Sequence, residues 1–186
     1  MKKYKIAVLV GSLRKESWNR QLARVLMGMM PEEFECEFVE IGDLPLYNQD
    51  DDYTPAEPVA RLRAQIKAAD GVLLISPEYN RSLSGVLKNA LDHGSRPWGE
   101  SVWRDKPAGV IGVAGGAIGT AVAQQHMRTI MAALNMPTMG HPEAFLQYQE
   151  DLFYDDNTPG ERSKDFLQNW VDSYVRWIKL HNSDLV

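Results

Sequence analysis

Short apolar runs alternate with segments of helical pattern along most of the 186-residue chain. Strands of a parallel sheet covered on both faces read as nearly continuous apolar runs, whereas helices show apolar residues at spacings of three and four. The alternation therefore predicts a parallel sheet with helices on both sides. The expected strands are Lys5–Val10, Glu35–Ile41, Gly71–Ser76, Ala108–Val113 and a weakly marked Thr138–His141, and the expected helices begin near Trp18, Pro55, Gly85, Gly119 and Pro159.

The length of the chain favours one well-buried domain over residues 1–186. Five strand–helix units on one sheet leave two main strand orders, one flavodoxin-like and one Rossmann-like. In the flavodoxin-like order 2-1-3-4-5, ligands bind outside the carboxyl ends of strands 1 and 3, which are neighbours at the switch point. This order predicts a site in the loops after strands 1 and 3, with a third contribution from the loop after strand 4.

Two helix starts carry the same local signal. Thr54-Pro55-Ala56-Glu57 and Thr158-Pro159-Gly160-Glu161 each read as a capping box, with Thr as N-cap, Pro at N1 and Glu at N3. The last helix carries an apolar stripe, for which core packing is the favoured role; contact of a single aromatic residue of the stripe with a partner subunit is the alternative. The stripe consists of Leu167, Trp170, Val171, Tyr174, Trp177, Ile178 and His181.

Charge and composition restrict the class of protein. A net charge of -5 and a pI near 5.4 argue against nucleic acid as the main partner. Cys36 is the one cysteine, so no intrachain disulfide forms and a reducing compartment is the natural setting. The first apolar run is short for a signal peptide, and no stretch is long enough to span a bilayer. We expect a cytoplasmic protein without membrane insertion.

The loop after the first strand reads Gly11-Ser12-Leu13-Arg14-Lys15-Glu16-Ser17-Trp18-Asn19. A helix N-terminus presents unpaired N–H groups and the positive end of its dipole, and here hydroxyl, amide and guanidinium donors stand beside it. The loop lacks both the Gly-Lys-Ser/Thr ending of a nucleoside-triphosphate loop and the G-x-G-x-x-G of a dinucleotide fold. It therefore favours a single monophosphate. An ordinary turn with Ser17 as N-cap is the alternative.

Two further loops follow strands 3 and 4. The first contains Pro77-Glu78-Tyr79-Asn80-Arg81, where Pro77 ends the strand and backbone amides can bond the edge of a planar heterocycle. A structural turn with Tyr79 half-buried is the alternative. Asn89 and Asp92, on the helix that follows, either tie this loop down or face water. The second loop is Ala114-Gly115-Gly116-Ala117-Ile118-Gly119, whose small residues permit close approach of a ligand or simply a tight turn.

No side-chain pattern indicates a metal site or a nucleophile. The histidines His93, His126, His141 and His181 are dispersed, and Asp50 to Asp52 read as a solvated loop without His or Cys beside them. Cys36 lies inside a strand pattern and reads as a small buried hydrophobe. There is no G-x-S-x-G elbow. A phosphate loop and a planar-ring loop without a catalytic side chain indicate that a bound cofactor carries the chemistry.

The motifs resemble those of the NAD(P)H-dependent FMN reductase family, and most closely its bacterial quinone and chromate reductase branch. The resemblance rests on Gly11-Ser12-Leu13-Arg14 with Ser17 and Asn19, and on Pro77-Glu78-Tyr79-Asn80 with Gly85, Leu87-Lys88-Asn89-Ala90 and Asp92. It is sharp over residues 5–20 and 71–96 and looser through residue 145. It implies a flavodoxin-like three-layer α/β/α sandwich with a five-stranded parallel sheet of order 2-1-3-4-5, FMN as bound cofactor and a homodimer or homotetramer.

The resemblance also implies the residues that bind FMN. The first loop wraps the phosphate, and the second lies along the isoalloxazine ring, while the third offers its backbone. The implied residues are Ser12, Leu13, Arg14, Ser17, Trp18 and Asn19, then Pro77, Glu78, Tyr79, Asn80 and Arg81, then Ala114 and Gly115. Relatives usually carry Pro where this chain has Ser84 and often an aromatic residue in place of Arg81. Arg81 either attracts anionic acceptors or nicotinamide phosphates, or is a surface or interface charge.

The implied activity is an oxidoreductase that passes two electrons from NADPH or NADH through FMN to quinones, with chromate, azo or nitro compounds as further acceptors. Three alternatives stay open. They are a flavodoxin-type electron carrier without nicotinamide activity, a flavin reductase that supplies reduced FMN to a monooxygenase, and a nucleotide-binding regulatory domain. Trp98 and Trp103, in a polar loop, belong either to a subunit interface or to the chain's own core.

Overall fold

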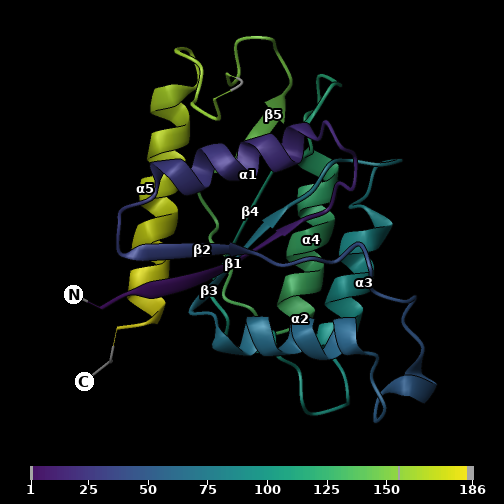
Figure 1. Cartoon of the computed structure of the whole chain (residues 1–186). Coiled ribbons are helices and arrows are strands. Elements are labelled where there is room, and N and C mark those ends of the chain that lie inside the picture. The colour runs from purple at the N-terminus through teal and green to yellow at the C-terminus, as the bar shows by residue number, and fades with distance from the viewer. Residues whose placement is uncertain (1, 155, 184–186) are drawn as a thin grey trace.

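The sheet has five parallel strands in the order β2-β1-β3-β4-β5. This computed structural model describes residues 2–154 and 156–183. The strands are β1 (Tyr4–Val10), β2 (Phe34–Phe38), β3 (Gly71–Ile75), β4 (Ala108–Ala114) and β5 (Phe145–Gln147). The predicted order 2-1-3-4-5 and the parallel pairing are confirmed (Figure 1).

Helices cover both faces of this sheet and complete three layers (Figure 1). Helices α1 and α5 pack on one face, and α2, α3 and α4 on the other. The helices are α1 (Trp18–Met29), α2 (Glu57–Ala68), α3 (Gly85–Gly94), α4 (Ala121–Ala133) and α5 (Lys164–His181), with a short 3-10 helix η1 (Gln49–Asp51). No helix among residues 2–154 and 156–183 is long and apolar enough to cross a membrane.

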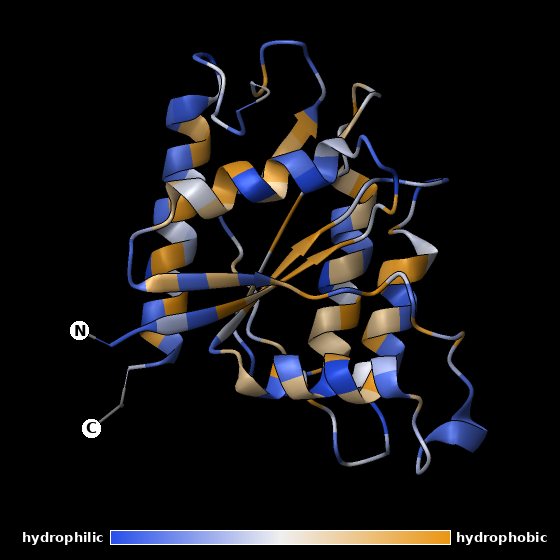
Figure 2. Ribbon diagram, viewed as in Figure 1, coloured by the Kyte–Doolittle hydropathy of each residue, from blue (hydrophilic) through white to orange (hydrophobic). Residues whose placement is uncertain are grey.

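Strand side chains alternate between two cores. In β1, Ile6, Val8 and Val10 point toward α1 and α5, whereas Ala7 and Leu9 point toward the opposite helices. Because both faces are buried, the strand reads as an unbroken apolar run. Figure 2 shows the resulting pattern, with hydrophobic colour along the central strands and mixed colour on the helices.

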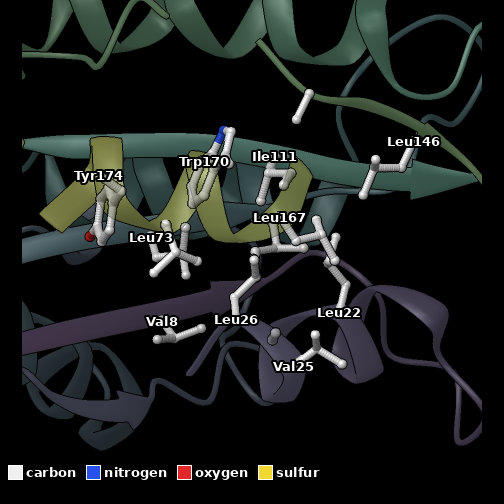
Figure 3. Close-up of a cluster of buried hydrophobic side chains, with 14 of the residues drawn as sticks. Val8, Leu22, Val25, Leu26, Leu73, Ile111, Leu146, Leu167, Trp170 and Tyr174 are labelled. Carbon is white, nitrogen blue, oxygen red and sulfur yellow. The ribbon is translucent and has the colours of Figure 1, made fainter. Parts of the chain in front are cut away.

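The predicted apolar stripe of the last helix is confirmed as core. Leu167, Trp170, Val171, Tyr174 and Ile178 are fully buried. Figure 3 shows three of them, Leu167, Trp170 and Tyr174, facing Val8, Leu73 and Ile111 of the sheet. Burial decreases toward the end of the stripe. Trp177 is half-buried, and His181 is exposed, with its ring packed edge-on against the Trp177 ring.

The fifth strand was predicted in the wrong place. Thr138–His141 is not a strand: Thr138 forms one isolated bridge with Ala108. The chain then passes Pro142 and pairs as β5 with Gly112 to Ala114. An edge strand of three residues with a single buried side chain, Leu146, leaves almost no apolar pattern to read.

Both predicted capping boxes are wrong. Helix α2 begins at Glu57 after Ala56, with no side-chain cap, so Thr54 does not cap it. Helix α5 begins at Lys164. Thr158 lies instead in a tight turn, where its N–H and hydroxyl donate to Asp156 and its carbonyl accepts the Tyr154 N–H. A local side-chain contact thus competes with the cap.

Other boundaries shift by a few residues. Strand β2 ends at Phe38 rather than Ile41, although Val39 and Ile41 remain buried beyond the ladder. Helix α4 begins at Ala121 rather than near Gly119, because Gly119, with a φ of 63°, closes a turn first. The predicted starts at Trp18 and Gly85 are confirmed.

The two tryptophans of the polar loop have different surroundings. Trp103 is fully buried and its Nε1 donates to the Leu91 carbonyl at 2.9 Å. Trp98 is 86% exposed, with the Arg96 guanidinium over its ring. The core role therefore holds for Trp103, and only Trp98 is available to a partner.

Replacement by alanine should have opposite effects on stability at two glycines, Gly112 and Gly28. A Cβ at Gly112 in β4 meets the Ser76 carbonyl oxygen at 2.1 Å, so Gly112→Ala should lower the free energy of unfolding by more than about 3 kcal/mol. A Cβ at Gly28 in α1 meets nothing within 4 Å, and Gly28→Ala should raise it by about 0.5 kcal/mol. Urea unfolding measures both; equal effects would contradict the packing described for β4.

Candidate functional site

Three loops meet at the carboxyl ends of β1, β3 and β4. They are residues 11–17, 76–84 and 115–120, and they come together at the upper right of Figure 1. Side-chain contacts described below join each pair of loops. The topology therefore places the three predicted segments around one point, as expected for a switch point between β1 and β3.

The first loop keeps its backbone donors free. Within the described part of the chain, no N–H group from Ser12 to Asn19 donates to another protein atom. Ser17 is buried and caps α1, its Oγ accepting the Arg20 N–H at 3.1 Å. The cap satisfies one donor and leaves the preceding ones to an anion, so the N-cap role and the phosphate role of this loop are compatible.

Asn19 binds the sheet rather than facing the loop. Its Nδ2 donates to the Val113 carbonyl at 2.9 Å, and its Oδ1 accepts the Val113 N–H at 3.0 Å. Both residues are buried. The side chain thus fastens the start of α1 to the end of β4, and the Asn19 backbone N–H is the group left for a ligand.

An aromatic wall stands beside the first loop. The Trp18 and Tyr148 rings stack with centroids 4.0 Å apart and planes 8° apart, and the Arg14 guanidinium lies 5.6 Å from the Trp18 ring. A Cβ at Gly115 would touch Trp18 at 3.6 Å, so Trp18 also borders the third loop. Tyr148 was not predicted as a site residue, because it follows the misplaced strand. Leu13 is exposed and contacts Gly42 of the loop after β2.

The second loop contains a tight turn. The Tyr79 and Ser82 backbones exchange two hydrogen bonds of 3.0 Å, and Asn80 and Arg81 between them have φ values of 50° and 65°. Two positive φ angles are the pattern of a type I′ turn, which Asn tolerates and Arg does not favour. The Tyr79 ring is 48% exposed, while Pro77 is buried. The N–H groups of Glu78, Asn80 and Arg81 have no partner among the described residues.

The Ser84 side chain lies against Gly11 of the first loop, where a larger residue would collide with it. It caps α3 by accepting the Leu87 N–H, and its own N–H donates to Ser76 Oγ at 3.3 Å. A Cβ at Gly11 would lie 2.4 Å from Ser84 Oγ. A side chain at position 11 would force Ser84 or the loop to shift, so Gly11 allows the first and second loops to lie close together.

The third loop offers backbone only. The Ala114 carbonyl accepts the Tyr148 N–H at 2.9 Å, and the Gly115 carbonyl accepts Gln147 Nε2 at 3.3 Å. The N–H groups from Gly115 to Ile118 have no partner in the described ranges. The turn of small residues therefore keeps backbone donors available, and contact of Ala114 and Gly115 with a cofactor stays a prediction.

Asn89 and Asp92 do not tie down the second loop. Asn89 accepts the Tyr47 N–H and donates to the Pro45 carbonyl, both at 2.8 Å, and so holds the connection that follows β2. His93, on the same helix, lies 2.8 Å from the Pro45 carbonyl. Asp92 pairs with Lys88 near the surface.

Other chemistry finds no support in the described residues. No group of three His, Cys, Asp or Glu side chains among them is placed to hold a metal ion. Burial raises the pKa of the Cys36 thiol to about 11, and its Sγ lies 3.3 Å from the Met30 sulfur. A thiol with so high a pKa is a poor nucleophile at neutral pH. A cavity of about 490 Å³ lined by Lys5, Glu35 and Gln65 lies at the opposite end of the sheet.

The three loops fit a planar, phosphorylated cofactor. Free N–H groups at a helix N-terminus suit a phosphate. Free N–H groups in the second and third loops suit the polar edge of a ring, and the aromatic wall suits its apolar surface. A bound cofactor of this kind would carry the chemistry itself, and the loops would supply its binding and orientation.

Comparison with known proteins agrees with this fit. Residues 4–151 match the model of the NADPH-dependent FMN reductase family. The chain belongs to this family. The predicted family, enzyme class and cofactors, FMN with a nicotinamide donor, are thereby confirmed.

Similar proteins match this FMN reductase family member over nearly its whole length. A 2-hydroxy-1,4-benzoquinone reductase of Burkholderia sp is 48% identical over 176 residues, which cover 94% of this chain and 96% of that protein. A quinone reductase of Pseudomonas putida is 46% identical over 181 residues, 97% of each chain. The structure of FerB, a flavoenzyme NAD(P)H:(acceptor) oxidoreductase of Paracoccus denitrificans, superposes with a TM-score of 0.92 at 41% identity and covers 96% of this chain and 98% of its own.

The Asn19 clamp predicts a large loss of stability on truncation. Asn19→Ala removes two buried hydrogen bonds and leaves the Val113 N–H and carbonyl unpaired, which should cost about 2–4 kcal/mol. Asn89→Ala is the matched control, because it also removes two bonds to backbone but at a site that water reaches, and should cost about 1 kcal/mol. Urea unfolding gives both values. A loss for Asn19→Ala no larger than that for Asn89→Ala would contradict the clamp.

Proposed function

We propose that this protein passes two electrons from NADPH or NADH, through FMN held by the three loops, to quinones. The observation that carries the proposal is the gathering of unpaired backbone N–H groups from three loops at one end of the sheet. The names of the similar proteins, which are quinone reductases, support quinones as the acceptor class. A single domain over residues 1–186 carries the activity in this proposal, and chromate, azo and nitro compounds are further acceptors.

The first loop would hold the FMN phosphate. The N–H groups from Ser12 to Trp18 and the positive end of the α1 dipole supply most of the attraction. Arg14, exposed and lying over Trp18, adds a forked charged donor. Ser17 and Asn19 act mainly by fixing the backbone of the loop through their contacts with α1 and β4.

The second and third loops would hold the ring. FMN, when bound, supplies the acceptance of a hydride and the delivery of two electrons. The N–H groups of Glu78, Asn80 and Gly115 are fixed donors that stabilise negative charge on a polar ring edge. The half-exposed Tyr79 ring and the small residues Ala114 and Gly115 would leave room beside the ring for a nicotinamide or a quinone. Arg81, 65% exposed at its side chain, adds positive charge at this opening.

Anaerobic reduction tests this function. The FMN-loaded protein should lose its visible flavin absorbance directly to the two-electron reduced form when NADPH or NADH is added, and should regain it when a quinone follows. Flavin that binds but resists both nucleotides would identify an electron carrier instead. Release of reduced FMN during turnover, detected after ultrafiltration, would identify a flavin-supplying reductase.

Replacing Arg14 should weaken binding of FMN, which has a phosphate, but not binding of riboflavin, which lacks one. Arg14→Ala should raise the dissociation constant for FMN about tenfold, through loss of a charged hydrogen bond, and leave that for riboflavin unchanged. Fluorescence quenching of flavin by the apoprotein measures both. Lys15→Ala is the control with the same change of charge in the same loop. An equal effect of Lys15→Ala would show that net charge, rather than the guanidinium, attracts the phosphate.

A homodimer or homotetramer in the cytoplasm completes the proposal. Leu46, Tyr53 and Trp98 are each more than four-fifths exposed in one chain, which suits burial against a second copy. Light scattering after gel filtration should give a mass of two or four chains of 21.0 kDa. A mass of one chain would refute the oligomer. A reducing compartment also suits the lone, half-buried Cys36.

A further inference from the structure

The Glu78 carboxylate is hydrogen-bonded to the start of helix α4. Its Oε2 accepts the N–H groups of Val122 and Ala123 at 3.0 and 3.1 Å, in the first turn of α4. Its Oε1 lies 3.4 Å from Arg81 Nη1, and its side chain is 8% exposed. Thr120, the N-cap residue of α4, makes no side-chain cap of its own. Glu78 therefore takes the place of the missing cap from 44 residues away.

The contact is favourable for physical reasons that do not involve a ligand. A carboxylate at a helix N-terminus satisfies donors that the helix itself cannot pair, and it lies at the positive end of the dipole. Hydrogen bonds to a charged acceptor are stronger than neutral ones. The ion pair with Arg81 contributes little, because the Arg81 side chain is 65% exposed.

The contact also joins two loops of the site. Glu78 directly precedes the Tyr79–Ser82 turn of the second loop, and Val122 and Ala123 lie in the first turn of α4, just after the third loop. Ser82, at the other end of the same turn, is hydrogen-bonded to His126 of α4 at 3.0 Å. The turn between them, which holds Arg81 at positive φ, is thus fixed to α4 at both ends. Such strained turns persist only where their surroundings hold them.

We propose that Glu78 is a positioning residue, whose carboxylate holds the second loop and the third loop at the separation needed to accept the flavin ring. The carboxylate acts through the α4 backbone, whereas only the Glu78 N–H would face the ligand. This inference rests on the proposed function, because it assumes that FMN lies between these two loops.

A matched pair of variants tests the proposal. Glu78→Gln keeps an oxygen that can accept the Val122 and Ala123 N–H groups, whereas Glu78→Met has a similar length and no such acceptor. The dissociation constant of the apoprotein for FMN should rise at least about tenfold for Glu78→Met, as expected for loss of charge-assisted hydrogen bonds, and less than about threefold for Glu78→Gln. Rescue by Gln is the result that a direct role of the negative charge does not give.

A control separates positioning from plain loss of stability. Asn135 ends α4 at its other end, with a φ of 56° and a bond from Nδ2 to Asp105. Asn135→Ala should lower the melting temperature as a change in the same helix, and leave the FMN dissociation constant within about twofold of wild type. If both Asn135→Ala and Glu78→Met weaken FMN binding equally, Glu78 acts only through helix stability and the proposal is wrong.

The outcomes also separate this inference from the proposed function. If the wild-type apoprotein does not bind FMN, the proposed function fails. If wild type binds and Glu78→Met binds equally well, or if Glu78→Gln is as weak as Glu78→Met, only the role of Glu78 fails. Should Glu78→Met not fold, amide hydrogen exchange on wild type decides. Saturating FMN should then slow exchange at Val122 and Ala123, and unchanged rates there would overturn the proposal.

Discussion

The two hydrogen bonds between Asn19 and Val113 fix the first loop against the end of β4. They join residues that are 94 positions apart, and they attach the first turn of α1 to β4 rather than to the strand that precedes it. Because of this attachment the free N–H groups of the first loop stand beside the end of β4, with Trp18 against Gly115. Apolar contacts between α1 and the sheet are not directional, so these two hydrogen bonds do most to orient the N-terminus of α1.

The other loops are joined in the same pairwise way. Gly11 and Ser84 bring the first loop against the second, and Glu78 brings the second against the start of α4. The three loops are therefore joined through Ser84, through Trp18 at the start of α1 and through the first turn of α4. A frame of this kind is preorganised: little conformational entropy remains to be lost when a ligand binds, so more of the interaction energy appears as affinity.

The sequence predicts the strands and their order better than the contacts that join the loops. The apolar runs of β1, β3 and β4 identify their strands because burial on both faces leaves a strong local pattern, and the strand order then places three loops together. Tyr148 and the carboxylate of Glu78 were missed in their actual roles, because their partners lie far along the chain and leave no local signal. Thr54 and Thr158 show the opposite error, because each has the local sequence of an N-cap but does not cap a helix. Thr158 is hydrogen-bonded to Asp156 instead, and α2 begins without a side-chain cap.

The long separation between Asn19 and Val113 has a consequence for synthesis of the protein. The first loop leaves the ribosome early, but the β4 partner of Asn19 follows 94 residues later, and the α4 donors that meet Glu78 begin 44 residues after Glu78 itself. Contacts between such distant segments form late, because the intervening chain must first be ordered. A nascent chain that ends before Val113 lacks both the partner of Asn19 and the donors that meet Glu78. Cofactor binding by the three loops therefore has to follow synthesis of β4 and the start of α4, and the amino-terminal half cannot bind the cofactor in this way alone.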